Sequence, residues 1–191
     1  MTEWTVVFWS SARQIAEEAA LPRALWPADE VAPGAFFRML CDAGETSAAI
    51  AYAAAALPKL EAIEWGLASL PPLAADDPNF AARMLLRDAS QRWLDEPDDD
   101  NRRAIERLVD GADQSWPETL IGLAIFFSGG SIAPEDCPPV PADPSLPGQL
   151  IAGAMQTVVA ETARSMPEFA TQVLDRANRL ATSGRQVVAT A

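Results

Sequence analysis

The side chains that could catalyse a reaction are few in this chain, because its 191 residues include no histidine. Ser-His-Asp and Cys-His catalysis are therefore excluded. The usual zinc hydrolases and the Glu-x-x-His di-iron bundles also need histidine ligands. The phosphate-binding motifs G-x-x-x-x-G-K-[ST] and G-x-G-x-x-G are absent as well. Carboxylates, arginines and a single lysine remain as the groups that could do chemistry.

The densest group of carboxylates is the acidic run Asp95, Glu96, Asp98, Asp99 and Asp100. Oxygen ligands of this kind can bind Ca²⁺, but the run lacks the ligand spacing and the glycine of an EF-hand. Capping of a following helix and a favourable interaction with its dipole explain the same residues without a metal. We therefore expect no metal and no cofactor.

The only lysine, Lys59, follows Pro58 and has Glu61 and Glu64 close by in sequence. A desolvated lysine can act as a nucleophile when its pKa falls. Neighbouring carboxylates have the opposite effect and raise the pKa of an amine. The sequence therefore favours a surface ion pair over a catalytic lysine.

The turn Ser128-Gly129-Gly130-Ser131 could present backbone N–H groups to an anion. It follows an apolar segment that is predicted to be helical, and the C-terminal end of a helix dipole repels anions. The alternative, a glycine stop that ends the helix, is favoured.

The segment from Leu120 to Phe127 is apolar on every face, which is typical of a helix buried on all sides. Ser115 and Glu118 precede it with the spacing of a capping box, in which each side chain bonds the other residue's backbone. A second Ser-x-Pro-Glu start occurs at 165–168. We predict a central buried helix over about 115–127.

Apolar residues recur at helical spacing along the rest of the chain, with proline, glycine or aspartate between the segments. No sustained alternating pattern follows residue 10, and residues 4–9 have extended preference without an evident partner strand. The predicted fold is all-α, a compact orthogonal bundle of about nine helices around the central one. A single domain over 1–185 and a flexible tail over 186–191 are expected. The other helices are predicted at about 11–20, 34–43, 46–56, 58–70, 79–95, 98–110, 150–164 and 165–183.

Pro134 to Pro147, with six prolines, is predicted to be a surface strap. Such a segment is preformed in polyproline II and can be bound by a groove on a partner. The alternative, a rigid connector that lies over the protein's own surface, is favoured. The two cysteines, Cys41 and Cys137, are predicted to be reduced thiols, one of them buried.

The formal net charge of −13 argues against nucleic acid and anionic lipid as partners, because both are polyanions. The N-terminus has Glu3 where a signal peptide would carry a basic residue. No apolar run reaches the roughly 18–20 residues of a membrane-spanning helix. We expect a cytoplasmic protein without membrane insertion.

Three short blocks stand out along the chain. They are L-P-K-x-E-A-x-x-W at 57–65, W-x3-P-x3-N-R-R at 93–103, and S-G-G-S-I-A-P at 128–134 leading to P-P-V-P at 138–141. In this order they resemble an uncharacterised bacterial family of small, mostly helical proteins. The resemblance implies a bacterial source and a helical architecture, and it supplies no activity and no catalytic residue.

The leading functional hypothesis is a non-enzymatic protein-interaction protein, an adaptor or accessory subunit that binds another protein and could also self-associate. The alternative is a helical domain that binds an apolar small molecule between the central helix and the 150–164 helix. An enzyme that uses only carboxylates comes third. The residues expected to form the partner-binding surface are Trp116, Ser128, Gly129, Gly130, Pro138, Pro139 and Pro141.

Overall fold

The computed structural model describes residues 3–28, 30–134 and 136–185, so the tail predicted for 186–191 lies outside the described residues. Within these ranges the chain forms nine α-helices and one short 3₁₀ helix, and the only β-pairing described there is an isolated bridge between Ser131 and Pro141. The all-α prediction is confirmed. The helices are α1 (Ala12–Glu18), α2 (Pro33–Asp42), α3 (Thr46–Ala56), α4 (Lys59–Ala68), α5 (Phe80–Asp95), α6 (Asp99–Val109), α7 (Pro117–Phe126), α8 (Leu146–Thr162) and α9 (Phe169–Ser183).

Glycine, proline and aspartate set several helix ends as the sequence predicts. Gly44 precedes α3 with a φ of 73°, in the left-handed region that favours glycine, and Gly184 ends α9 with a φ of 68°. At the start of α6, the Asp98 carboxylate accepts a hydrogen bond from the backbone N–H of Asn101 at 2.8 Å. Pro58 stops α3 and opens α4. These residues fix the boundaries locally.

The two predicted capping boxes are wrong. Pro117 occupies the first turn of α7, so the N-cap is Trp116, and the Ser115 hydroxyl instead donates to Asp113 Oδ1 at 2.7 Å. In the second case the Ser165 hydroxyl donates to the Thr162 carbonyl at 3.1 Å, at the end of the preceding helix. Neither serine accepts an N–H bond from the helix that follows it in the described contacts.

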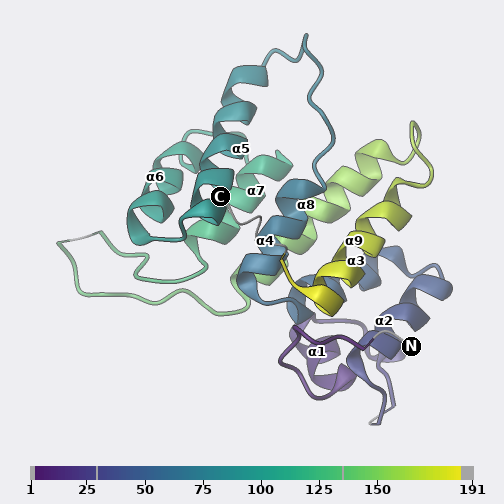
Figure 1. The fold of residues 1–191 in the computed structure, drawn as a ribbon. Helices are drawn as coiled ribbons and strands as arrows, with labels where there is room; N and C mark the ends of the chain where they lie inside the picture. The colour runs from purple at the N-terminus through teal and green to yellow at the C-terminus, as the bar shows by residue number, and fades with distance from the viewer. Residues whose placement is uncertain (1–2, 29, 135, 186–191) are drawn as a thin grey trace, which may run out of the picture.

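Helix α7 is covered by α4, α5, α6 and α8, and Figure 1 shows it among these neighbours. Ile121, Ala124 and Ile125 are fully buried, which confirms that the apolar segment is an inner helix. The burial is incomplete at Leu120, Leu123 and Phe127, which are half-buried.

Helix α8 shares the centre of the molecule, because it packs on α3, α4 and α9 as well as on α7. It begins at Leu146, four residues before the predicted start, because Pro147 fits in the first turn.

On the other side of α3 lie α1 and α2 (Figure 1). The extended N-terminal residues lie against α9, where Thr5 and Val6 both donate to the Ala181 carbonyl at 3.0 and 3.1 Å.

A glycine allows α7 to approach α6 closely. A Cβ atom at Gly122 would lie 2.6 Å from Val109 Cγ1 and 3.2 Å from Ile105 Cγ2, both buried side chains of α6. Such distances are shorter than van der Waals contact, so a larger residue would push the two helices apart.

We predict that Gly122→Ala lowers the free energy of unfolding by about 1–3 kcal/mol, because the clash outweighs the better helix propensity of alanine. Gly111→Ala is the matched control, since a Cβ atom at Gly111 would meet nothing within 4 Å. Urea unfolding monitored by circular dichroism measures both. Equal stability of the two variants would contradict the close contact between α6 and α7.

Candidate functional site

The Ser128–Ser131 turn after α7 is the place where the three sequence blocks come together. Lys59, at the start of α4, donates from Nζ to the Ser128 carbonyl at 2.6 Å. It therefore bonds a backbone oxygen 69 positions away rather than the acidic neighbours predicted for it. One of those neighbours, Glu64, pairs with Arg185 instead.

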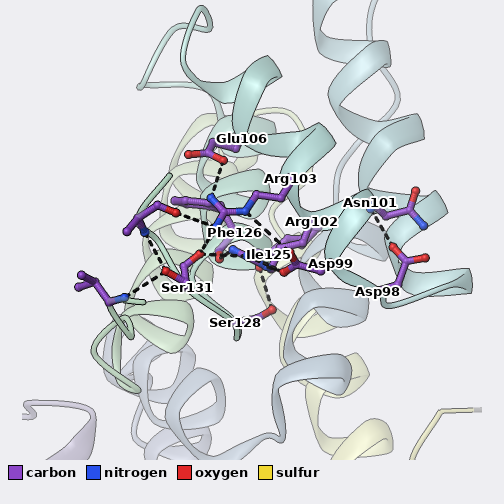
Figure 2. A network of polar contacts seen from close by, with 12 residues as sticks. Asp98, Asp99, Asn101, Arg102, Arg103, Glu106, Ile125, Phe126, Ser128 and Ser131 are labelled. Atoms are coloured by element: carbon purple, nitrogen blue, oxygen red, sulfur yellow. Dashed lines mark hydrogen bonds and ion pairs between the residues drawn. The ribbon is translucent and has the colours of Figure 1, made fainter. Parts of the chain in front are cut away.

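Arg102 of α6 connects the end of α7 to this turn. It is only 3 % exposed, and its Nη1 donates to the Phe126 carbonyl at 2.9 Å while Nη2 donates to the Ser131 carbonyl at 3.0 Å (Figure 2). The Asp99 carboxylate accepts a bond from Nε at 2.8 Å and balances the charge. All three nitrogens of this buried guanidinium are thus satisfied.

Arg103 binds the next residues of the turn. Its Nη2 donates to the Ser131 and Ala133 carbonyls at 2.7 and 2.8 Å, and its Nη1 pairs with Glu106 at 3.1 Å (Figure 2). The guanidinium groups of Arg102 and Arg103 also lie 5.2 and 5.8 Å from the centre of the Phe126 ring. We refer to Arg102 and Arg103 together as the arginine clamp.

The arginine clamp shows that the turn presents carbonyl oxygens, not N–H groups, to its neighbours. Gly130 has a φ of 66°, and a Cβ atom there would lie 2.8 Å from Arg102 Nη2. The glycine is therefore needed for both backbone conformation and space. Helix α7 ends at Phe126 with Phe127 as its C-cap, so the left-handed Gly130 lies beyond the position of a glycine stop. The geometry of the turn does not support the anion-binding alternative either.

The arginine clamp is not among the residues expected from the sequence to form a site, although Arg102 and Arg103 both lie in the second block of the family resemblance. The signal was present in the helical spacing: the fully buried face of α6 consists of Arg102, Ile105 and Val109, at intervals of three and four. An arginine on that face must be paired, and its position predicts a buried polar contact.

The turn also fixes the base of the proline strap. Ser131 Oγ accepts hydrogen bonds from Ala133 N–H at 3.1 Å and Val140 N–H at 3.0 Å, and Ile132 N–H donates to the Val140 carbonyl at 2.8 Å. With the Ser131–Pro141 bridge, these bonds close the two sides of the strap into a stem.

The strap is exposed to solvent both in the stem and beyond it. Pro138, Pro139 and Pro141 are exposed, and 47 % of the Val140 surface is accessible. In Figure 1 this segment is the long loop between α7 and α8 that projects at the left. The strap therefore does not lie flat on the protein's own surface, contrary to the favoured alternative.

Trp116 lies at the opposite end of α7 from the Ser128–Ser131 turn. The intervening ten-residue helix is about 15 Å long at 1.5 Å per residue. The Trp116 ring packs instead beneath the guanidinium of Arg83, 6.0 Å from the ring centre. Trp116 is thus separated from the turn and the strap by the length of α7.

Glu118 is fully buried beside Trp116 and pairs with arginines of α5. Arg83 donates to both of its carboxylate oxygens, and Arg87 Nε donates to Oε1 at 2.9 Å. Asp77 also accepts from Arg83, at 2.9 Å. Since the two arginines and two carboxylates balance in charge, this cluster serves to join α5 to α7.

A shallow cavity of about 260 Å³ lies beside the turn, between α6 and the residues that follow α7. Trp93 and Pro97 form part of its wall, and Gly129 and Gly130 form another part. Asp98 and Asp99 also line it, but they are used in capping α6 and in pairing with the clamp. Among the described residues, no group of three or more possible ligands could hold a metal ion.

The aspartates with shifted pKa values are bound by backbone N–H groups at turns. The pKa values of Asp77, Asp113 and Asp143 are lowered. The main cause is that each carboxylate accepts a hydrogen bond from the backbone N–H of the residue two positions later in the chain. A lowered pKa is the reverse of what a carboxylate acid catalyst needs near neutral pH. These shifts give the carboxylate-enzyme hypothesis no support.

The packing of α7 on α8 does not support the apolar ligand pocket expected between these helices. A Cβ atom added to Gly66 of α4 would touch both Ile121 of α7 and Ile151 of α8, so these two side chains already fill the space. A cavity of about 240 Å³ lies elsewhere, where α3, α4 and the start of α8 meet.

Both cysteines are free thiols, but their surroundings differ. Cys41 is half-buried, and desolvation together with the negative charges of Asp42 and Asp175 raises its pKa to about 11. Cys137 lies on the strap and is exposed. The strap thus carries an accessible thiol at its outer part.

Comparison with protein families gives a match over most of the chain. The model of a family described as "Family of unknown function (DUF6931)" matches residues 36–181, which include all three blocks and most of the helices. No curated protein and no solved structure matches the chain. No helix in the described part of the chain has the length and apolarity needed to cross a bilayer.

Removing the arginine clamp should weaken the fold and release the strap stem. We predict that Arg102→Met lowers the free energy of unfolding by about 2–4 kcal/mol, because the Phe126 and Ser131 carbonyls lose a buried donor. The control is Arg107→Met, an exposed arginine on the same helix. Chemical denaturation gives the stability, and hydrogen exchange at Ile132 and Val140 reports the stem. Equal protection in both variants would show that the clamp does not hold the stem.

The two thiols should differ in reactivity. In the folded protein at pH 8 we predict that iodoacetamide modifies Cys137 first, because Cys41 is mostly a protonated, half-buried thiol. In Cys137→Ser, the rate at Cys41 should rise about tenfold per pH unit between pH 8 and 10, since only the thiolate reacts. Intact-mass spectrometry follows both rates. Equal rates at pH 8 would contradict the assignment.

Proposed function

We propose that this chain, which belongs to DUF6931, a family of unknown function, is a non-enzymatic protein-interaction protein of the bacterial cytoplasm. In this proposal it acts as an adaptor or accessory subunit and offers its proline strap to a groove on another protein. The observation that carries the proposal is the contrast between the exposed outer strap and its hydrogen-bonded stem.

The stem favours binding because it restricts the conformations of the free strap, so less conformational entropy is lost when a partner binds it. The hydrogen bond from Val140 N–H to Ser131 Oγ joins the two sides of the stem, and the Ser131 carbonyl is fixed by the arginine clamp. Prolines restrict φ further along the strap. A recognition segment that is already ordered loses less conformational freedom on binding.

The type of groove follows from which atoms of the strap are free. The N–H and C=O groups of Val140 are both used in the stem, so its side chain is the part left for recognition. The neighbouring Pro138, Pro139 and Pro141 have no N–H to donate. A partner would therefore read apolar side chains in a shallow, aromatic-lined groove, as polyproline-binding domains do.

The negative charge of this protein favours a partner that has basic residues around such a groove. The formal net charge of −13 produces a negative field over the surface. A partner with lysines and arginines beside the groove would associate faster than a neutral one, and the rate would fall with ionic strength.

The natural thiol of Cys137 allows a direct test in a Cys41→Ser background. A benzophenone attached to Cys137 is photolysed in lysate of the source organism, and the crosslinked proteins are identified by mass spectrometry. We predict that Pro138→Ala/Pro139→Ala reduces the yield of a specific adduct at least fivefold, because the preformed strap is lost. The matched control is Pro72→Ala/Pro78→Ala, two exposed prolines between α4 and α5.

The identified partner is then purified, and its affinity for the wild type and both double variants is measured by calorimetry. A strap peptide covering residues 131–144 should compete with the protein. If no adduct depends on the strap prolines, or if the purified partner binds all variants equally, the proposed function is wrong.

A further inference from the structure

A second cavity lies away from the strap, between the end of α4 and the start of α9. Its volume is about 230 Å³. In Figure 1 the loop that leads into α9 is at the upper right, whereas the strap projects at the left. The cavity walls are mainly apolar and include Leu70, Pro71, Met166, Phe169 and Val173.

The two helices beside this cavity are bonded to each other. The Trp65 side chain is fully buried, and its Nε1 donates to the Val173 carbonyl at 2.9 Å, which fixes α9 against α4. Pro71 and Pro72 stiffen the wall that follows α4. Cavities with such walls are largely formed before a ligand enters.

The polar groups at this cavity are unpaired. Arg176 is the only titratable side chain that lines it, and it makes no hydrogen bond or ion pair with another described residue. The Gln172 side chain on the same wall is also without a described partner. By contrast, the buried or half-buried Arg83, Arg87 and Arg102 are all paired with carboxylates.

A third polar group at the same wall is Ser69. Its hydroxyl is buried and has no hydrogen-bond partner among the described residues. Buried polar atoms without a partner are uncommon and call for a specific explanation. Here the unpartnered hydroxyl coincides with an unpaired arginine in a mostly apolar cavity.

From this combination we infer that the cavity binds a small monocarboxylate with an apolar body. The guanidinium of Arg176 is suited to pair with a carboxylate through two parallel hydrogen bonds, and Phe169, Met166 and Val173 would contact the apolar part. Inorganic phosphate fits poorly, because a single arginine and apolar walls would not replace its hydration. The volume is below the roughly 300–1,000 Å³ of drug-sized sites, so the ligand is small.

The proposal is independent of the strap and of any partner protein. With one charged contact and a small apolar surface, we expect a dissociation constant on the order of 0.1–1 mM for simple acids. The overall negative charge of the protein weakens rather than creates this binding. Binding would therefore depend on the one short-range ion pair.

The probes are hexanoate and benzoate, each compared with its uncharged amide at constant ionic strength and pH 7. The readout is the NMR signal of the Met166 methyl group, assigned with Met166→Leu, because this side chain lines the cavity. We expect saturable shifts with at least one acid, at least tenfold weaker binding of the matching amide, and no saturable shift with inorganic phosphate. Equal binding of acid and amide, saturable binding of phosphate, or no saturable shift with either acid would overturn the proposal.

Three variants locate the site. Arg176→Gln should weaken acid binding at least tenfold, whereas Arg179→Gln, an exposed arginine on the same helix that does not line the cavity, should leave it unchanged. Ala68→Phe narrows the cavity from an exposed position, so it should block binding without disturbing the core. Thermal unfolding confirms that each variant is folded. Unchanged binding in Arg176→Gln and Ala68→Phe would also overturn the proposal.

Discussion

The burial of helix α7 depends on arginines from two other helices, which neutralise a carboxylate at its start and bond a carbonyl at its end. Near its N-terminus the carboxylate of Glu118 is fully buried and is neutralised by Arg83 and Arg87 of α5. At its C-terminus the Phe126 carbonyl accepts a hydrogen bond from Arg102 of α6. Without these partners, burial of both ends would be unfavourable.

The same constraint joins the core to the surface. Arg102 contacts the last turn of α7 and also the Ser131 carbonyl, where the strap stem begins. The strap is therefore attached to the core through a buried guanidinium, not through a flexible linker. Buried charged pairs cost desolvation, and removing one partner is more destabilising than never having the pair. Any change at this guanidinium should therefore affect the α7 end and the strap together.

The features that the sequence predicts well depend on short-range rules. Helix α3 begins at Thr46 and ends at Ala56 as predicted, because Gly44 and Pro58 act on their immediate neighbours. The site depends on contacts that no local rule contains, such as Lys59 with the Ser128 carbonyl. The predicted capping role of Glu118 failed for the same reason, since distant arginines compete for its carboxylate. The sequence shows where the strap prolines lie. It does not predict that they are exposed, because their exposure depends on the long-range hydrogen bonds that close the stem.

The arginines of this protein fall into two kinds, those paired within the fold and those left without a described partner. At the junctions of α7 with α5 and α6, each guanidinium is matched by a carboxylate or by backbone carbonyls, so little charge is left for a ligand. Arg176 differs because its cavity contains no other charged side chain. An unpaired guanidinium beside apolar walls gains most from a ligand that brings both a carboxylate and apolar surface. A molecule with only one of the two would leave part of the cavity unmatched.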